Sequence, residues 1–191
     1  WLRRRRWIRR RRRRFWWGRC LRSVVTMDLA RLLRHLATTS ARVRRAFPAS
    51  TLRSIEQAIA ASELTHAGEI RFVVEGSLDG LPLLRGQTAR ERAIELFARL
   101  HVWDTEHNTG VLIYVLLADR RVEIVADRGI HAKAGAEAWS VICRGMETHF
   151  GAGDFGRGAT QGIEAVTQLV TRHFPLTPGD RNELPDAPLL L

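Results

Sequence analysis

The spacing of apolar residues predicts helices and strands between about residue 28 and residue 174. Apolar residues recur every three or four positions in five segments and cluster in three short runs. We expect helices over 28–47, from Pro48, from Thr88, over 136–150 and over 157–174, and strands over 70–74, 111–118 and 122–127. Their order predicts an α/β (α+β) sandwich, in which helices pack on both faces of a small mixed β-sheet containing a central hairpin.

Three local signals strengthen this prediction. All eight residues over 111–118 are apolar, which is typical of a strand covered on both faces. Thr88 and Glu91 have the Thr-x-x-Glu spacing of a capping box at a helix start. Residues 119–121 are expected to form the tight turn that joins the last two strands into an antiparallel hairpin.

Finer expectations concern single segments. Side chains over 70–75 alternate with the period of a strand, and residues 76–86 are expected to form a loop. Ile94 is expected to lie in the buried stripe of its helix, and Trp103 to be a packing residue. The last residues, 189–191, follow a proline-rich stretch and are expected to be frayed.

Positive charge is concentrated at one end of the chain. The formal net charge is +11, but the first 26 residues hold twelve arginines and no acid, whereas the rest holds 19 basic and 20 acidic residues. The chain therefore divides into four parts. These are a basic extension over 1–26, either disordered or non-native, an N-terminal helical segment over 27–46, a folded domain over 47–174 and a proline-rich tail over 175–191.

The basic extension interleaves arginine with four of the six tryptophans. Such a pattern neutralises phosphates and either stacks on bases or inserts at a lipid interface. Nucleic-acid or anionic-membrane binding through this arm is therefore one open alternative, provided that the arm is native. The candidate residues are Arg3, Arg4, Arg9, Arg10, Trp16 and Trp17.

Apolar runs are too short to predict a membrane span. A span needs about 18 consecutive apolar residues, and the longest run here has eight. The arginine block is not followed by the apolar stretch of a cleavable signal peptide. We expect a cytoplasmic or peripheral membrane protein, in which Cys20 and Cys143 are free thiols.

Three segments of the middle region resemble the TPM domain family. They are NTGVLIY at 108–114, DRRVEI at 119–124 and RGI at 128–130, within a resemblance that runs from about Phe47 to Phe174. The family includes thylakoid-lumen proteins, photosystem II repair proteins, a receptor modulator and many bacterial membrane-associated proteins. The resemblance implies a sheet sandwiched by helices, divalent-metal binding and, from the plant members, phosphatase activity on phosphomonoesters.

The sequence departs from the family where acidic residues are usual. Asn108-Thr109 stands where the family tends to have Asp-Asn, and His131 and Gly135 stand near positions where it has acids. These departures weaken the implied metal site. They favour a binding module over an enzyme.

Polar residues flank both strands of the predicted hairpin at its open end. An antiparallel hairpin brings the segment before its first strand beside the segment after its second strand. The candidate polar cluster is Asp104, Glu106, His107, Asn108, Asp127 and His131. Its members suit Ca²⁺ or another divalent cation, or acid–base chemistry by histidine, whereas a polar rim shaped only by turn geometry is the alternative.

Within this cluster Asp104, Asn108 and Asp127 are the candidate metal ligands.

The glycine-rich segment 151–158 precedes a predicted helix and resembles a phosphate-binding loop. It lacks the Gly-Lys-Ser/Thr ending and does not follow a predicted strand, so a helix-to-helix connection is the favoured interpretation.

Three functional hypotheses follow. The first is a non-catalytic accessory module for membrane-protein assembly or quality control, which binds a protein partner that is itself a candidate membrane protein. The alternative is a divalent-metal-dependent phosphatase in which Asp104, Asp127 and His131 are the metal ligands or the base. The third is binding of nucleic acid or an anionic membrane through the basic arm.

Overall fold

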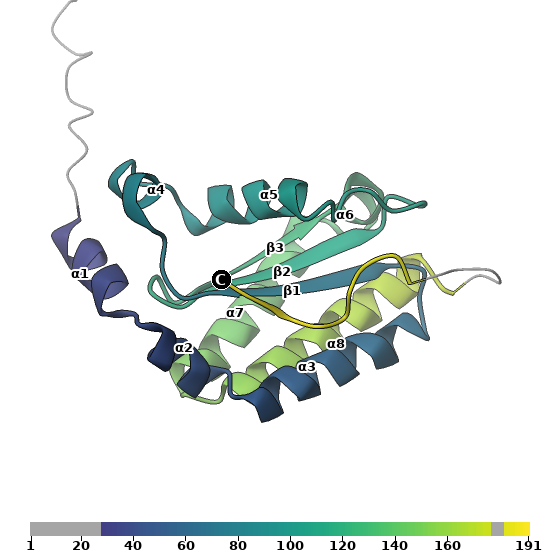
Figure 1. The fold of residues 1–191 in the computed structure, drawn as a ribbon. Helices are drawn as coiled ribbons and strands as arrows, with labels where there is room; N and C mark the ends of the chain where they lie inside the picture. Colours follow the sequence, from purple (N-terminus) through teal and green to yellow (C-terminus); the bar gives the residue numbers. More distant parts are fainter. Residues whose placement is uncertain (1–27, 177–181) are drawn as a thin grey trace, which may run out of the picture.

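The computed structural model describes residues 28–176 and 182–191, which form eight helices and a four-stranded sheet (Figure 1). The helices are α1 (Leu29–Ala37), α2 (Ser40–Ala46), α3 (Ala49–Glu63), α4 (Gly80–Leu84), α5 (Ala89–Arg99), α6 (Arg128–Ala134), α7 (Ala136–Gly151) and α8 (Phe155–His173). The strands are β1 (Glu69–Glu75), β2 (Gly110–Leu116), β3 (Arg121–Ala126) and β4 (Leu189–Leu190).

The sheet is mixed and has the order β3-β2-β1-β4. β1 and β2 run parallel, and β2 and β3 form the expected antiparallel hairpin, in which Leu116 pairs with Arg121. Every residue of β2 is buried, as its unbroken apolar sequence predicts for a strand covered on both faces. The predicted fold class is confirmed, with β2 inside the sheet and β3 at one edge.

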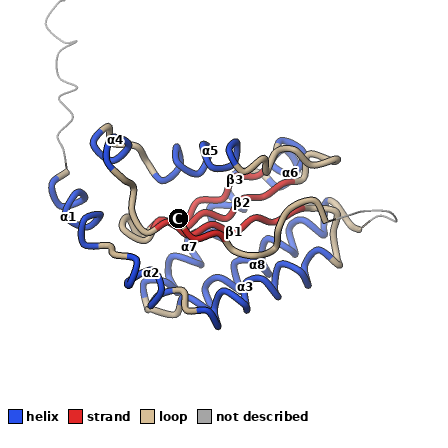
Figure 2. The backbone as a smooth tube through the Cα atoms, viewed as in Figure 1, coloured by secondary structure: helices blue, strands red, loops and turns tan. Residues whose placement is uncertain are grey.

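Helices cover the two faces unequally (Figure 2). One face packs against α3, α7 and α8 in a core that includes Ile55, Trp139 and Val166. The other face packs against α5 through Ala93 and Leu96. The capping box at the start of α5 is confirmed, because Thr88 accepts the Glu91 amide and the Glu91 carboxylate accepts the Thr88 amide.

Two predicted segments are wrong, and one helix, α6, was not predicted. The segment 28–47 is two helices, since the chain turns at Thr38 and Thr39. The expected loop over 76–86 contains the short helix α4. The chain after β3 enters α6 directly, because Asp127 caps the first turn of that helix with its side chain.

Two side chains expected to be buried are half-exposed. Ile94 lies on the outer face of α5, whose buried residues are Ala89, Ala93 and Leu96. Trp103 is also half-exposed, and its ring contacts the His101 ring. Small alanines face the sheet on α5, and this close packing turns the larger Ile94 outward.

The C-terminal residues are ordered in the sheet, so the expectation of fraying is wrong. β4 runs parallel to β1, with Val73 opposite Leu189. The Leu191 amide donates to the Val74 carbonyl at 2.9 Å. The β1 edge would otherwise carry unpaired backbone groups, and this short strand covers part of it.

No helix in the described part of the chain is long and apolar enough to cross a bilayer. Arg3, Arg4, Arg9, Arg10, Trp16 and Trp17, which carry the arm hypothesis, lie outside the described residues, as does Cys20. Cys143 is a free cysteine on α7, and burial raises the pKa of its thiol to about 12.

Candidate functional site

The open end of the β2–β3 hairpin brings the loop before β2 beside the start of α6. The Asp127 amide donates to the Gly110 carbonyl at 2.8 Å, which closes the hairpin. A Cβ atom built on Gly129 would lie 2.6 Å from the Asn108 carbonyl oxygen. Residues 107–110 and 127–129 are therefore in backbone contact, which brings together two of the segments that carry the predicted polar cluster.

The side chains of the candidate polar cluster differ in how far they are buried. Asp104, Glu106, His107, Asn108 and His131 are exposed. The Glu106 amide donates to the Glu183 carboxylate, so this part of the loop faces the C-terminal segment.

Other polar groups of the loop hold its own shape. Asn108 has φ 53°, a left-handed conformation that asparagine tolerates better than most residues. The Thr109 amide donates to the Thr105 hydroxyl, and the Thr109 hydroxyl donates to the Ala67 carbonyl. The Thr105–Thr109 contact is local turn geometry, whereas the Thr109–Ala67 contact ties the loop to the segment before β1.

Asp127 is the buried member of the cluster, with 6% of its surface exposed. One carboxylate oxygen accepts the Arg128 amide as the cap of α6, and Oδ2 is buried with no hydrogen-bond partner among the described residues. In those residues, no three side chains of His, Cys, Asp or Glu lie close enough to hold a metal ion. The ligand set Asp104, Asn108 and Asp127 stays a prediction, for which the Asp127 Oδ2 atom is the structural support.

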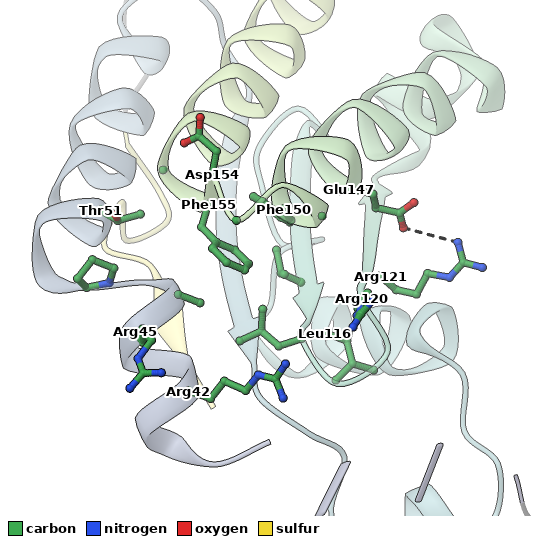
Figure 3. Close-up of a pocket in the computed structure, with 17 residues that line it drawn as sticks. Arg42, Arg45, Thr51, Leu116, Arg120, Arg121, Glu147, Phe150, Asp154 and Phe155 are labelled. Carbon is green, nitrogen blue, oxygen red and sulfur yellow. Dashed lines mark ion pairs between the residues drawn. The ribbon is translucent and has the colours of Figure 1, made fainter. Parts of the chain in front are cut away.

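The opposite end of the hairpin borders a cleft of about 810 Å³ (Figure 3). α2 forms one wall, the end of β2 and the β2–β3 turn form another, and the α7–α8 connection forms a third. Four arginines line it, namely Arg42, Arg45, Arg120 and Arg121, together with the carboxylates of Glu147 and Asp154.

Three of these arginines are unpaired. Arg121 makes an ion pair with Glu147 at 3.7 Å. The side chains of Arg42, Arg45 and Arg120 make neither an ion pair nor a hydrogen bond with any described residue. Arg42 reaches from α2 toward the turn that carries Arg120, and both residues also line a smaller adjoining pocket (Figure 3). The cleft therefore presents free guanidinium groups.

Arg120 has an unusual backbone conformation, with φ 54° in the last position of the turn. Glycine or asparagine is the ordinary residue there, because a Cβ atom makes the left-handed conformation unfavourable by about 1–2 kcal/mol. The sequence patterns described above do not predict this cleft. An arginine at a hairpin position that favours glycine is the signal that could have pointed to it.

Aromatic packing fixes the cleft walls. The Phe47 ring, at the end of α2, lies 6.0 Å from the Phe150 ring of α7 and 5.4 Å from the Phe155 ring of α8. Phe150 and Phe155 stack on each other with centroids 5.3 Å apart. Since Phe47 is 1% exposed, α2 is anchored to the core and cannot shift without breaking these contacts.

α1 docks beside the cleft through its polar face. The Arg31 guanidinium donates to both carboxylate oxygens of Asp119 in the turn and to the Gln87 carbonyl. His35 is buried, accepts the Leu78 amide at Nδ1, and lies 3.1 Å from Asp119 at Nε2. Burial raises the pKa of Asp119, but the hydrogen bonds from Arg31 and His35 outweigh it and hold that pKa below its ordinary value.

The apolar side of α1 faces solvent. Leu29, Leu33 and Leu36 are 64%, 58% and 71% exposed and recur at helical spacing. We call these three residues the leucine row. An amphipathic helix of a globular protein ordinarily buries its apolar stripe, and α1 does the reverse.

These features define a mixed α/β domain. The open end of its hairpin carries a polar loop, the turn end borders an arginine-lined cleft, and the amphipathic helix α1 turns its leucines to solvent. A family model for the TPM domain matches residues 44–169. The chain therefore belongs to the TPM domain family, as the resemblance of its short motifs predicts.

Two solved structures are similar to this chain. One is the NMR structure of the BA42 protein from the psychrophilic bacterium Bizionia argentinensis, at 28% identity and a TM-score of 0.66, covering 75% of this chain and 94% of that chain. The other is the N-terminal domain of a P. gingivalis protein, at 21% identity and a TM-score of 0.51, covering 63% and 76%, which supports the fold alone. No curated protein matches the chain.

Proposed function

We propose that this TPM domain protein is a non-catalytic accessory module that attaches to the surface of an anionic membrane and serves membrane-protein assembly or quality control there. The observation that carries the proposal is the inversion of α1. Its polar residues Arg31 and His35 bind Asp119 and Leu78 of the domain, and its leucine row is exposed to solvent.

The docking of α1 is too specific to be a chance orientation of the helix. Arg31 and His35 both converge on the carboxylate of Asp119, which lies in the turn 88 and 84 residues away. Asp119 is partly buried, so rotating α1 to bury its leucines would leave this carboxylate without its partners Arg31 and His35, which is unfavourable. The leucine row is thus held outward by the fold.

The charged residues around α1 indicate which kind of surface the leucine row binds. Arg34 on α1 and Arg42, Arg44 and Arg45 on α2 are exposed, and none has an ion pair within the described residues. The basic extension with its twelve arginines precedes α1 directly in sequence. Leucines flanked by unpaired arginines match a bilayer interface with anionic headgroups, where apolar side chains enter the acyl boundary and cations meet phosphate.

Vesicle flotation tests this role. The full chain is expected to float with phosphatidylcholine vesicles that contain phosphatidylglycerol, and the Leu29→Gln/Leu33→Gln/Leu36→Gln variant to lose that binding. Each leucine removed from the interface weakens binding by about tenfold, since burial of a leucine is worth about 1.5 kcal/mol or more.

The control is Leu64→Gln/Leu176→Gln, because these two leucines are also exposed but lie beyond the far ends of α3 and α8. It should float like the parent chain. All substituted leucines are exposed, so the variants should fold normally. Equal flotation of the leucine-row variant and the control would rule out α1 as the attachment element.

The alternative function, a divalent-metal-dependent phosphatase, is favoured by one observation, the buried Oδ2 atom of Asp127, which has no hydrogen-bond partner among the described residues. A cation bound there would polarise a phosphoryl oxygen. Metal-dependent hydrolysis of a phosphomonoester that disappears in Asp127→Asn and persists in the leucine-row variant would favour this alternative.

A further inference from the structure

The arginine-lined cleft is chemically distinct from the leucine row and from the open end of the hairpin. Four guanidinium groups face two carboxylates across its walls, so the cleft carries an excess of two positive charges. Arg121 and Glu147 neutralise each other at 3.7 Å. The excess therefore resides on Arg42, Arg45 and Arg120, with Asp154 as the remaining carboxylate.

The acidic residues of the cleft are engaged elsewhere. Glu147 accepts the Val122 amide at 3.0 Å in addition to its ion pair. Asp154 accepts the Arg157 amide at 3.3 Å as the cap of α8. Neither carboxylate binds Arg42 or Arg120. These two guanidinium groups keep their donors available for a ligand that enters the cleft.

Arg120 supplies a second, independent observation. It holds a left-handed backbone conformation, φ 54°, at a turn position where glycine would be unstrained. Strained non-glycine residues concentrate at ligand-binding positions, where the side chain has a role that offsets the strain. The Arg120 side chain makes neither a hydrogen bond nor an ion pair with any described residue, so its donors are available to a ligand.

We propose that this cleft binds the phosphate group of a phosphomonoester through Arg42 and Arg120, with Arg45 at its rim. A phosphomonoester carries a charge of about −1.5 to −2 at neutral pH and three acceptor oxygens, which matches two or three unpaired arginines. A single carboxylate carries one negative charge and is satisfied by one bidentate arginine. The charge of the cleft thus favours the phosphate.

The remaining walls fit an organic group next to the phosphate. Ala46, Pro48, Val115 and Phe155 line the cleft beside the arginines. The volume of about 810 Å³ lies in the range of small-molecule sites, which runs from about 300 to 1,000 Å³. The α7–α8 connection at 151–156 also lines the cleft, so the positive end of the α8 dipole borders it.

This site does not depend on membrane attachment. The phosphate can belong to a soluble phosphomonoester or to a lipid whose headgroup is itself a phosphomonoester, such as phosphatidic acid, because both present a terminal phosphate with a charge of about −1.5 to −2. The cleft adjoins a smaller pocket lined by Leu33 and Arg34 of α1, through the shared residues Arg42 and Arg120. A lipid bound at the interface would place its headgroup within reach of the same arginines.

Titration calorimetry with phenyl phosphate, and with benzoate as the carboxylate of the same ring, tests the proposal. Phenyl phosphate is expected to bind the full chain and benzoate to bind at least about tenfold more weakly. Arg42→Gln and Arg120→Gln should each weaken phenyl phosphate binding about tenfold or more, since each removes charge-assisted hydrogen bonds.

Arg44→Gln is the matched control, because it removes the same charge from the same helix at a residue that does not line the cleft. It should change the affinity by less than about twofold, as expected for a screened surface charge. Equal losses for Arg42→Gln and Arg44→Gln, benzoate binding as tight as phenyl phosphate, or no binding of phenyl phosphate would each overturn the proposal.

Two further arms identify the source of the phosphate. Phosphatidylcholine vesicles containing phosphatidic acid should displace phenyl phosphate if the site takes a lipid headgroup, and should leave it bound if the ligand is a soluble phosphomonoester. The Leu29→Gln/Leu33→Gln/Leu36→Gln variant should retain phenyl phosphate binding in either case. A failure of the membrane role and a failure of the phosphate site are thereby distinguishable.

Discussion

The two ends of the β2–β3 hairpin use backbone conformation in opposite ways. At the open end, a Cβ atom on Gly110 would lie 1.8 Å from the Val102 carbonyl oxygen, so packing excludes any side chain there. At the turn end, Arg120 holds a left-handed conformation that glycine would adopt without strain. Glycine is required at position 110 because the backbone of Val102 approaches so closely. At position 120 an arginine is present although glycine would fit the backbone conformation better.

This difference distinguishes polar side chains that stabilise the fold from polar side chains that are available to a ligand. The polar residues near Gly110 satisfy backbone groups of the fold. The Thr105 hydroxyl accepts the Thr109 amide of its own loop, and the Thr109 hydroxyl donates to the Ala67 carbonyl before β1. The side chains of Arg42, Arg45 and Arg120 form neither a hydrogen bond nor an ion pair with any described residue. The polar side chains near Gly110 are explained by the hydrogen bonds that they make within the fold. The unpaired guanidinium of Arg120, on a left-handed backbone, is better explained by a ligand that it binds.

The largest expected effect is at the open end. Gly110→Ala should destabilise the fold by about 3 kcal/mol or more, because its Cβ atom would collide with backbone that cannot shift without opening the hairpin. Urea denaturation measures the loss. The control is Gly145→Ala on α7, where nothing lies within 4 Å of the new Cβ atom.

Gly145→Ala should stabilise the fold by about 0.5–1 kcal/mol, since alanine is the better residue inside a helix. The comparison fails if the two substitutions shift stability by the same amount. It would also fail if Gly110→Ala were neutral, because the open end would then be free to accept a side chain.

Local patterns predict the fold well because they report burial and turn chemistry directly. The apolar run of β2 and the capping box of α5 each depend on neighbours within a few residues. The cleft is different. It arises where α2 meets a turn more than 70 residues later, and neither segment shows in its own sequence that the other lies beside it.

The errors have the same origin. Ile94 has the spacing of a core residue, but the closeness of α5 to the sheet is set by Ala89 and Ala93, and this cannot be judged from hydrophobicity alone. The order at Leu189 depends on a free edge of β1, which is a property of the finished sheet. Tertiary contacts decide both outcomes.

The second expected effect concerns the link between α1 and the turn end. Asp119→Asn should release α1, since the carboxylate that receives Arg31 and His35 would be lost while asparagine remains acceptable in a turn. Hydrogen bonds to charged groups are worth about 1.5–3 kcal/mol, so the docking equilibrium of α1 should weaken by about 2 kcal/mol. Amide exchange resolved by residue should quicken in α1 and stay slow in β2.

The same contact predicts an acid dependence. Because the folded pKa of Asp119 is held below its ordinary value of about 3.9, its stabilising effect is present above that value and is lost as the pH falls through the lower folded pKa. Protection of α1 amides from exchange should therefore fall below about pH 4 in the parent chain. In Asp119→Asn, α1 should be unprotected at pH 7 as well.

The third expected effect is a gain. Arg120→Gly should stabilise the fold by about 1 kcal/mol, because glycine relieves the left-handed strain, while it weakens phenyl phosphate binding. Arg120→Ala removes the same guanidinium and keeps the strain. It should lose binding equally and gain no stability, and a gain in both variants would show that the side chain, not the backbone, is the source of the cost.

The smallest expected effect is at Asp127, where two contributions oppose each other. Asp127→Ala removes the cap of α6, a loss of about 1 kcal/mol, but it also removes a buried oxygen that has no described partner, which partly offsets the loss. The net destabilisation in a calcium-free buffer should be below about 1 kcal/mol. Asp104→Ala, at an exposed residue, should stay within about 0.5 kcal/mol.

Calcium sharpens this last test. A ligand that binds only the folded state raises the free energy of unfolding, so added Ca²⁺ should raise the melting temperature of the parent chain and not that of Asp127→Asn if Oδ2 is a cation ligand. Asparagine keeps a capping oxygen, which separates the cap from the charge. An equal response of both chains to Ca²⁺ would leave Asp127 as a helix cap alone and the arginine cleft as the chemically active end of the hairpin.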